Sequence, residues 1–266
     1  MRPQRGDHVK VAVLVKRVPD TASELQVAAD GKSVATGGLK FVMSPYDEHA
    51  VELAIQLKES HGAEVVVLSA GPPECREIIR SALAMGADSG VLIDTSQSGE
   101  LTPRGAARLL AAAIADLGAE LVLAGKQAVD DDAAQVPERV AELMGIPHAS
   151  VITRFELGGA TASVDREIEG GQYTLEVPLP ALFTTQKGIN TPRYPTPPNI
   201  MKAKKKEIRE VPAAQLGVAA DSLSAQTVTE SMSLPRQQRL CKVIEGDSTQ
   251  SVKELVRILH VEEKVL

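Results

Sequence analysis

The sequence predicts an α/β fold: a mainly parallel sheet with helices on both faces, followed by a β-hairpin region and an extended C-terminal arm. Strand-like and helix-like segments alternate through the first half, glycine pairs then separate short strand-like runs, and the end of the chain has too few apolar residues for a core of its own. With 266 residues, of which 43% are hydrophobic, the chain is long enough for one large core with an appendage.

The alternating segments occupy residues 9–124. Short apolar runs typical of buried parallel strands cover residues 9–15, 63–70, 90–94 and 119–124. Amphipathic helical patterns cover residues 46–61, 73–85 and 103–117. Because right-handed crossovers join such strands into a parallel sheet, ligands are expected at the carboxyl ends of the strands. The segments that could share one cleft there are 16–20, 70–73 and 125–135, with 44–47 at a helix start.

Hairpins are predicted next, from strand-like runs at residues 150–157, 161–167, 172–177 and 181–185. The pairs Gly158-Gly159 and Gly170-Gly171 are turn signals between them. We therefore predict one α/β domain over residues 1–200, which includes the hairpin region 150–185.

The rest of the chain lacks the alternation of strand-like and helix-like segments. Four prolines within residues 190–199 exclude a helix or a central strand there, so we expect a stiff, exposed loop. Residues 207–266 are predicted to form an arm that packs on another surface, with one amphipathic helix over residues 252–261.

The most informative loop begins at Gly125, directly after the apolar run 119–124. A helix is expected from Pro137 to Met144, and Val136 before it has no side-chain oxygen to cap the free N–H groups. Such uncapped donors favour a phosphate. The alternative is an ordinary strand-helix loop, in which Asp132 caps the helix with Gln135 as its capping-box partner.

Composition and motifs exclude several function classes. A net charge of −6 argues against a nucleic-acid surface, and we expect no signal peptide or membrane insertion. The histidines, at positions 8, 49, 61, 148 and 260, show no metal-ligand spacing, and no nucleophile motif is present. A nucleotide-shaped site without a catalytic group indicates binding, sensing or redox carriage.

Several separated motifs resemble those of one family, the beta (small) subunit of electron transfer flavoproteins. The matching segments, in order, are Val15 to Asp20, Ser44 to Glu48, Ala82 to Asp88, Gly125 to Asp132, Arg166 to Gly171, Leu179 to Ala181, Pro192 to Tyr194 and Pro198 to Lys204. Their order and spacing hold from about residue 9 to residue 217. The resemblance implies a Rossmann-like fold of the adenine nucleotide alpha hydrolase type.

The resemblance also implies a heterodimer with an alpha subunit that holds most of the redox FAD, while the beta subunit buries one structural AMP. The protein would be an electron carrier without substrate turnover of its own. The implied AMP pocket consists of Leu14, Ser44, Pro45, Tyr46, Asp47, Ala70, Gly125, Lys126, Gln127, Ala128, Val129, Asp130, Asp131, Asp132, Ala133, Ala134, Gln135 and Val136. Some members place an aromatic residue beside the flavin near the position of Thr21, which this chain lacks, so Tyr46 is the candidate for that neighbourhood.

A recognition loop for acyl-CoA and related flavin dehydrogenases is implied at residues 190–206. Its partner-binding residues would be Arg193, Tyr194, Pro197, Asn199, Ile200, Met201, Lys202 and Lys205. Pro197 stands where the family commonly has an anchoring leucine. The family passes electrons on to a quinone oxidoreductase in fatty acid beta-oxidation, which implies a bacterial cytoplasmic or mitochondrial matrix location.

Two alternatives stay open. The stretch Ala134-Gln135-Val136 is similar to electron-bifurcating members, which bind a second FAD in place of AMP, whereas the triple aspartate at 130–132 favours the AMP type. A nucleotide-sensing module of the universal-stress type would share the parallel sheet and need no flavin. The hairpin region and the arm favour an interface with a dissimilar subunit instead.

Overall fold

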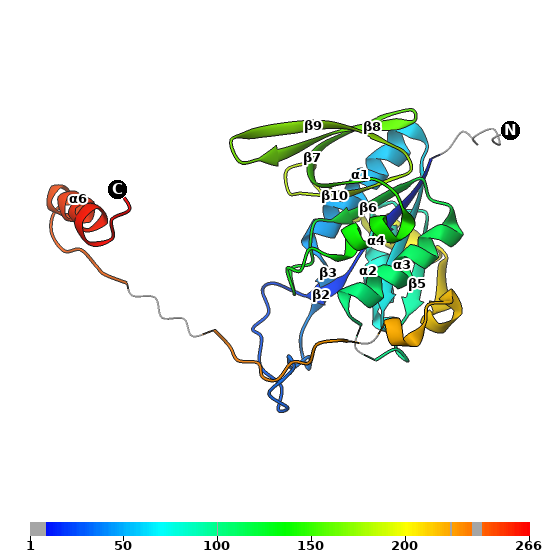
Figure 1. Cartoon of the computed structure of the whole chain (residues 1–266), viewed down its shortest axis with the longest axis horizontal. Coiled ribbons are helices and arrows are strands. Elements are labelled where there is room, and N and C mark those ends of the chain that lie inside the picture. Colours follow the sequence, from blue (N-terminus) through cyan, green and yellow to red (C-terminus); the bar gives the residue numbers. More distant parts are fainter. Residues whose placement is uncertain (1–8, 100, 224, 236–240) are drawn as a thin grey trace. The chain divides into compact units, whose positions relative to one another are not determined.

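A computed structural model describes residues 9–99, 101–223, 225–235 and 241–266 (Figure 1). The chain divides into two compact units, one formed by residues up to 25 together with 36–228, the other by Gln26–Ala35 with Thr229–Leu266. The start of the chain, including His8, lies outside the described residues.

The first unit is built on a nine-stranded sheet in the order β11-β5-β4-β1-β6-β10-β7-β8-β9. Its parallel strands are β1 (Lys10–Leu14), β4 (Glu64–Gly71), β5 (Ser89–Asp94), β6 (Leu121–Gly125), β10 (Ala181–Thr185), β11 (Ile208–Pro212) and β7 (His148–Gly158). After β1 the chain adds β4 and β5 on one side and then returns to add β6 on the other. The carboxyl ends of β1 and β6 therefore form the topological switch point, where such sheets bind ligands.

Helices cover both faces of this sheet, as the sequence predicted. They are α1 (Pro45–His61), α2 (Arg76–Met85, after the 3-10 turn Pro73–Cys75), α3 (Pro103–Leu117) and α4 (Val136–Met144). Val11 and Val13 of β1 belong to the core with α1 and α2, whereas Ala12 and Leu14 belong to the core with α3 and α4. Each fully buried aliphatic side chain contributes about 1.5–3 kcal/mol, so β1 is fixed between two apolar layers.

The hairpin prediction is confirmed for three strands and wrong for the fourth. β7, β8 (Thr161–Ile168) and β9 (Gly171–Pro178) form an antiparallel meander. Residues 181–185 instead form β10, which lies parallel to β6 and β7 and between them. The physical reason is burial: all five β10 residues are buried, so the strand needs cover on both faces.

Two further segments differ from the predictions. Part of the proline-rich segment is helical, because α5 (Pro197–Ala203) starts at consecutive prolines, whose missing N–H groups cost nothing in a first turn. Residues 208–212 join the main sheet as β11, so the arm starts later than residue 207. A short antiparallel pair, β2 (Arg17–Pro19) and β3 (Phe41–Met43), precedes α1 and was not predicted.

The second unit contains α6 (Ser248–Arg257), which continues into a π-helical turn (Ile258–Glu262). The helix begins at Ser248, before the predicted residue 252, because the Asp247 side chain caps it by accepting a hydrogen bond from Gln250 N at 2.9 Å. Val252 and Val256 remain exposed on it, at 60% and 50%. Within the described ranges, no helix has the length and apolar character to cross a membrane.

Candidate functional site

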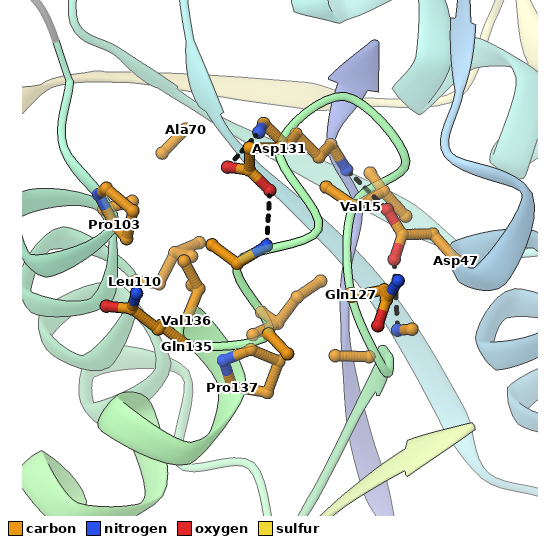
Figure 2. Close-up of a pocket in the computed structure, with 18 of the residues that line it drawn as sticks. Val15, Asp47, Ala70, Pro103, Leu110, Gln127, Asp131, Gln135, Val136 and Pro137 are labelled. Carbon is orange, nitrogen blue, oxygen red and sulfur yellow. Dashed lines mark hydrogen bonds and ion pairs between the residues drawn. The ribbon is translucent and has the colours of Figure 1, made fainter. Parts of the chain in front are cut away.

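A cleft opens at the switch point, lined by the carboxyl ends of β1, β4 and β6 and by the loop that leads to α4 (Figure 2). Its empty space, including the part open to solvent, is about 790 Å³. The predicted site residues that line it are Leu14, Asp47, Ala70, Gly125, Gln127, Ala128, Asp131, Ala133, Ala134, Gln135 and Val136. Segments more than 100 residues apart in sequence thus meet at one edge of the sheet, because parallel strands end on the same side.

Asp47 connects three elements at the inner wall of the cleft. Its Oδ1 accepts a hydrogen bond from Gly125 N at 3.0 Å and its Oδ2 accepts one from Lys16 N at 2.8 Å. The side chain thereby joins the start of α1 to the ends of both β1 and β6. Burial raises the pKa of this carboxyl group to about 7, although both backbone donors favour its charged form.

Gly125 has no room for a side chain. A Cβ there would lie 2.5 Å from Asp47 Oδ1 and 2.7 Å from the carbonyl carbon of Tyr46. A glycine is therefore required at the end of β6, because the start of α1 approaches the strand too closely for a side chain. The helix and the strand together form the inner wall of the cleft.

Lys16 holds the loop over the cleft. Its Nζ lies 2.8 Å from Asp130 Oδ1 and 3.0 Å from Asp131 Oδ2, and Asp131 Oδ1 also accepts a hydrogen bond from Ala133 N. Partial burial disfavours the charge of Lys16, but its hydrogen bonds and attraction to Asp130 and Asp131 prevail and raise its pKa. The positive charge of Lys16 therefore offsets part of the negative charge of the two aspartates. The loop repels an anionic ligand less than two unpaired carboxylates would.

The start of α4 has no side-chain cap, as predicted, but the helix begins at Val136, one residue earlier than expected. Gln135, the residue before the helix, makes no capping hydrogen bond, and Pro137 is in the first turn. The alternative helix start at Asp132 is wrong, because Asp132 has φ 47° and its Oδ1 accepts a hydrogen bond from Gln127 Nε2 at 2.7 Å. Ala134 also has positive φ, 48°, so the chain turns sharply into the helix and its first N–H groups stay available for a ligand.

The opposite wall comes from α3, which sequence reasoning missed. Thr102 caps this helix by accepting a hydrogen bond from Gly105 N at 3.1 Å. Pro103 and Leu110 line the cleft behind it (Figure 2). On the β1 side the cleft is lined by Lys16, which belongs to the segment 16–20 that was expected to reach it. The two α3 residues were not predicted. The further unpredicted lining residues are Val15, Leu101, Thr102, Ala106, Ala124 and Pro137. The helix had been predicted, but no local pattern tells which helix end faces a cleft.

Seven of the predicted pocket residues do not line the cleft: Ser44, Pro45, Tyr46, Lys126, Val129, Asp130 and Asp132. Ser44 is fully buried at the start of α1 and Asp130 pairs with Lys16 from outside the cleft. Tyr46 is half-buried, and Lys126 Nζ lies 4.8 Å from the centre of its ring, a cation–π contact. These residues support the cleft or face another surface.

The predicted partner-binding residues gather around α5. Tyr194, Ile200 and Met201 expose 94%, 45% and 61% of their surface. Pro197, Lys202 and Lys205 are exposed as well, whereas Arg193 and Asn199 are half-buried. Exposed tyrosine and methionine side chains are enriched at protein–protein interfaces.

Together these features define a doubly wound, Rossmann-like α/β protein with a ligand cleft at its switch point. The model of the electron transfer flavoprotein domain matches residues 32–216. The chain belongs to the electron transfer flavoprotein family and corresponds to its beta subunit.

Its relatives include bacterial and mammalian proteins, each named electron transfer flavoprotein subunit beta. The Bacillus subtilis protein is 37% identical over 255 residues, which cover 96% of this chain and 98% of the relative. The Homo sapiens protein is 40% identical over 94% of this chain and 99% of its own. The Syntrophomonas wolfei protein is 44% identical over 78% of this chain and 81% of its own. The nucleotide-sensing alternative receives no support from these matches.

Proposed function

We propose that this chain pairs with an alpha subunit to form a flavoprotein that carries electrons from flavin dehydrogenases of the acyl-CoA type to a quinone oxidoreductase. FAD is held at the interface of the two subunits, and one AMP is bound in the cleft of this chain as a structural nucleotide. The observation that carries the proposal is the cleft at the β1/β6 switch point with the uncapped start of α4, in a chain of this family.

The geometry of the cleft supports AMP. A phosphate near Gln135 and Val136 accepts hydrogen bonds from backbone N–H groups that have no side-chain cap, and the helix dipole adds about 0.3–2 kcal/mol. Pro103 and Leu110 offer an apolar wall for a base. Asp131 pairs with Lys16 through Oδ2 and also lines the cleft. Its carboxylate can accept hydrogen bonds from ribose hydroxyls there.

Tyr46 is our candidate residue beside the flavin. Its ring is half-buried at the start of α1, outside the cleft, and Lys126 lies over it. When bound, FAD supplies the reversible uptake and release of electrons that no side chain of this protein provides. This chain's own part is to form one wall of the flavin site and to keep water away from it.

Reduction of the purified complex tests the proposal. The chain is co-expressed with its alpha subunit, and the complex is mixed with an acyl-CoA dehydrogenase and its substrate under nitrogen. The proposal predicts a yellow complex whose flavin absorption bleaches only when both dehydrogenase and substrate are present. A colourless, flavin-free complex would overturn it.

A second candidate rests on the residues at the start of α4. Ala134-Gln135-Val136 resembles bifurcating members, and the cleft is open enough to admit part of a larger dinucleotide. In that case a second FAD replaces AMP. The two candidates differ in released nucleotides, which can be counted.

The remaining surfaces suit the partners of such a carrier. The exposed residues around α5 are proposed to dock on the dehydrogenase, and the second unit, with Val252 and Val256 exposed on α6, to pack on the alpha subunit. The complex is proposed to act in the bacterial cytoplasm or mitochondrial matrix.

A further inference from the structure

Residues 190–206, here called the docking segment, combine four prolines with highly exposed apolar side chains. Tyr194 is 94% exposed and Met201 61%. A segment with so little burial at its centre has few apolar contacts to hold it in one conformation. What orders it must be found at its ends.

Arg193 attaches the first end to α1. Its Nε and Nη2 each lie 2.9 Å from an oxygen of the Glu52 carboxylate, and its backbone N–H donates to Glu52 Oε2 at 3.2 Å. Glu52 is only 3% exposed. A buried carboxylate is costly unless it is paired, and the planar guanidinium matches both of its oxygens, so this contact fixes position as well as charge.

The same guanidinium also binds Glu59, two turns further along α1, with Nη1 2.5 Å from Oε1 and Nη2 3.0 Å from Oε2. Asn190 adds a third attachment to this helix: its Nδ2 donates to the His49 carbonyl at 2.9 Å, and its Oδ1 lies 2.9 Å from His49 Nδ1. The side chain of Arg193 is therefore fully engaged within this chain, although its neighbour Tyr194 is not.

The other end is attached to α2. Arg80 Nη1 donates to the carbonyl oxygens of Ala203 and Lys206, at 2.5 and 2.6 Å. Lys206 Nζ in turn donates to the Leu83 carbonyl at 3.2 Å. The exposed part of the docking segment thus spans two fixed points on two helices of the core.

We propose that Arg193 is a positioning residue: it acts through Glu52 and Glu59 to hold the docking segment in its binding conformation before the dehydrogenase arrives, rather than by contacting that partner. This inference rests on the proposed function. A segment ordered in advance loses less conformational entropy on binding, because its side chains need not be immobilised at that step. Arg193 therefore contributes to affinity without adding contact area.

Two variants test it in the complete complex with the alpha subunit. Arg193→Lys keeps the positive charge and loses the bidentate contact with the Glu52 carboxylate. The double variant Glu52→Gln/Arg193→Gln removes both charges, so no buried carboxylate is left unpaired and the fold is retained. Arg76→Gln is the matched control, because Arg76 pairs with Glu210 on the surface outside the segment.

The readouts are amide hydrogen exchange over residues 190–206 and the KM and kcat for reduction of the complex by an acyl-CoA dehydrogenase. For both test variants we expect exchange in the segment and the KM to rise about tenfold, with kcat changed less than twofold and flavin content equal to wild type. The control leaves all four values near wild type. A raised KM with unchanged exchange would mean direct contact, and raised exchange with unchanged KM would mean that order in the segment is irrelevant. Either result overturns the inference.

The same experiment separates this inference from the proposed function. If the dehydrogenase reduces the wild-type complex but the variants behave like wild type, only the inference fails. If it does not reduce the wild-type complex, the proposed function fails, and the exchange data alone decide whether Arg193 holds the segment.

Discussion

Asp47 Oδ1 accepts a hydrogen bond from Gly125 N at 3.0 Å, and this contact joins the start of α1 to the end of β6 at the inner wall of the cleft. The carboxylate is 6% exposed, and its other oxygen accepts from Lys16 N. One buried side chain therefore ties together the three elements that shape the site. Substitutions around it should affect the fold and the proposed binding of AMP together.

Gly125→Ala tests the close approach. The added Cβ would meet Asp47 Oδ1 at 2.5 Å and the carbonyl carbon and Cβ of Tyr46 at 2.7 Å, and backbone cannot move aside cheaply. We expect a loss of about 1–3 kcal/mol in the free energy of unfolding and a lower AMP content in the purified complex. Chemical denaturation and nucleotide analysis measure both. The control is Gly37→Ala, where a Cβ meets nothing within 4 Å, and equal behaviour of the two variants would refute the steric account.

The pH dependence of stability tests the burial of Asp47. Its pKa rises from 3.8 to about 7 on folding, so the folded state holds a proton that the unfolded state releases between these values. Stability from this group is present at low pH and is lost as the pH rises through that window, by up to about 1.4 kcal/mol per pH unit.

Asp47→Asn mimics the protonated form and removes this dependence. Urea denaturation from pH 4.5 to pH 7.5, roughly the window of the titration, should show a wild-type stability that falls relative to that of the variant. Parallel curves for the two proteins would show that Asp47 does not titrate there.

Lys16→Gln tests the contact that holds the loop. Lys16 and its partners Asp130 and Asp131 are partly exposed, so the expected loss of stability is small, about 1 kcal/mol or less. The larger expected effect is faster release of AMP from the complex, because the loop closes the cleft. Lys40→Gln, which breaks the surface pair with Asp20, serves as control. Equal AMP release rates for both variants would count against the role of Lys16.

The uncapped start of α4 gives a further prediction. Gln135→Asn and Gln135→Asp both supply a side-chain oxygen to the free N–H groups and should each stabilise the AMP-free helix by about 1 kcal/mol. Both occupy donors that a phosphate needs, and only the aspartate adds repulsion. AMP affinity, measured by calorimetry on the complex refolded without AMP, should fall in the order wild type, Asn, Asp. An aspartate variant that binds as tightly as wild type would place the phosphate elsewhere.

Much of the fold could be predicted from local patterns. The predicted strand ends at Val15, Ala70 and Ala124 were expected to meet because parallel strands end on one side of a sheet, and all three residues line the cleft. The position of β10 in the sheet was not predicted, because residues 181–185 were assigned to a hairpin with the strands before them. Pairing with strands distant in sequence determines that position. The signal was there in Ala181 to Thr185, which lacks the alternation of a half-exposed strand.

The site was predicted less completely than the fold. Residues 16–20 were expected to reach the cleft, but the pairing of Lys16 with Asp130 and Asp131 could not be predicted, because these partners lie more than 110 residues away in sequence. Pro103 and Leu110 were missed because a helical pattern shows which residues share a face, and not which end of the helix meets a ligand. Long-range contacts of this kind are visible only in three dimensions.

Release of the bound nucleotides is the most direct test of the central claim. The complex with the alpha subunit is purified, denatured and filtered, and the released FAD and AMP are separated and counted against protein. The account predicts one FAD and one AMP for each heterodimer. Two FAD without AMP would contradict the structural AMP and support the bifurcating alternative, and release of neither nucleotide would contradict the account as a whole.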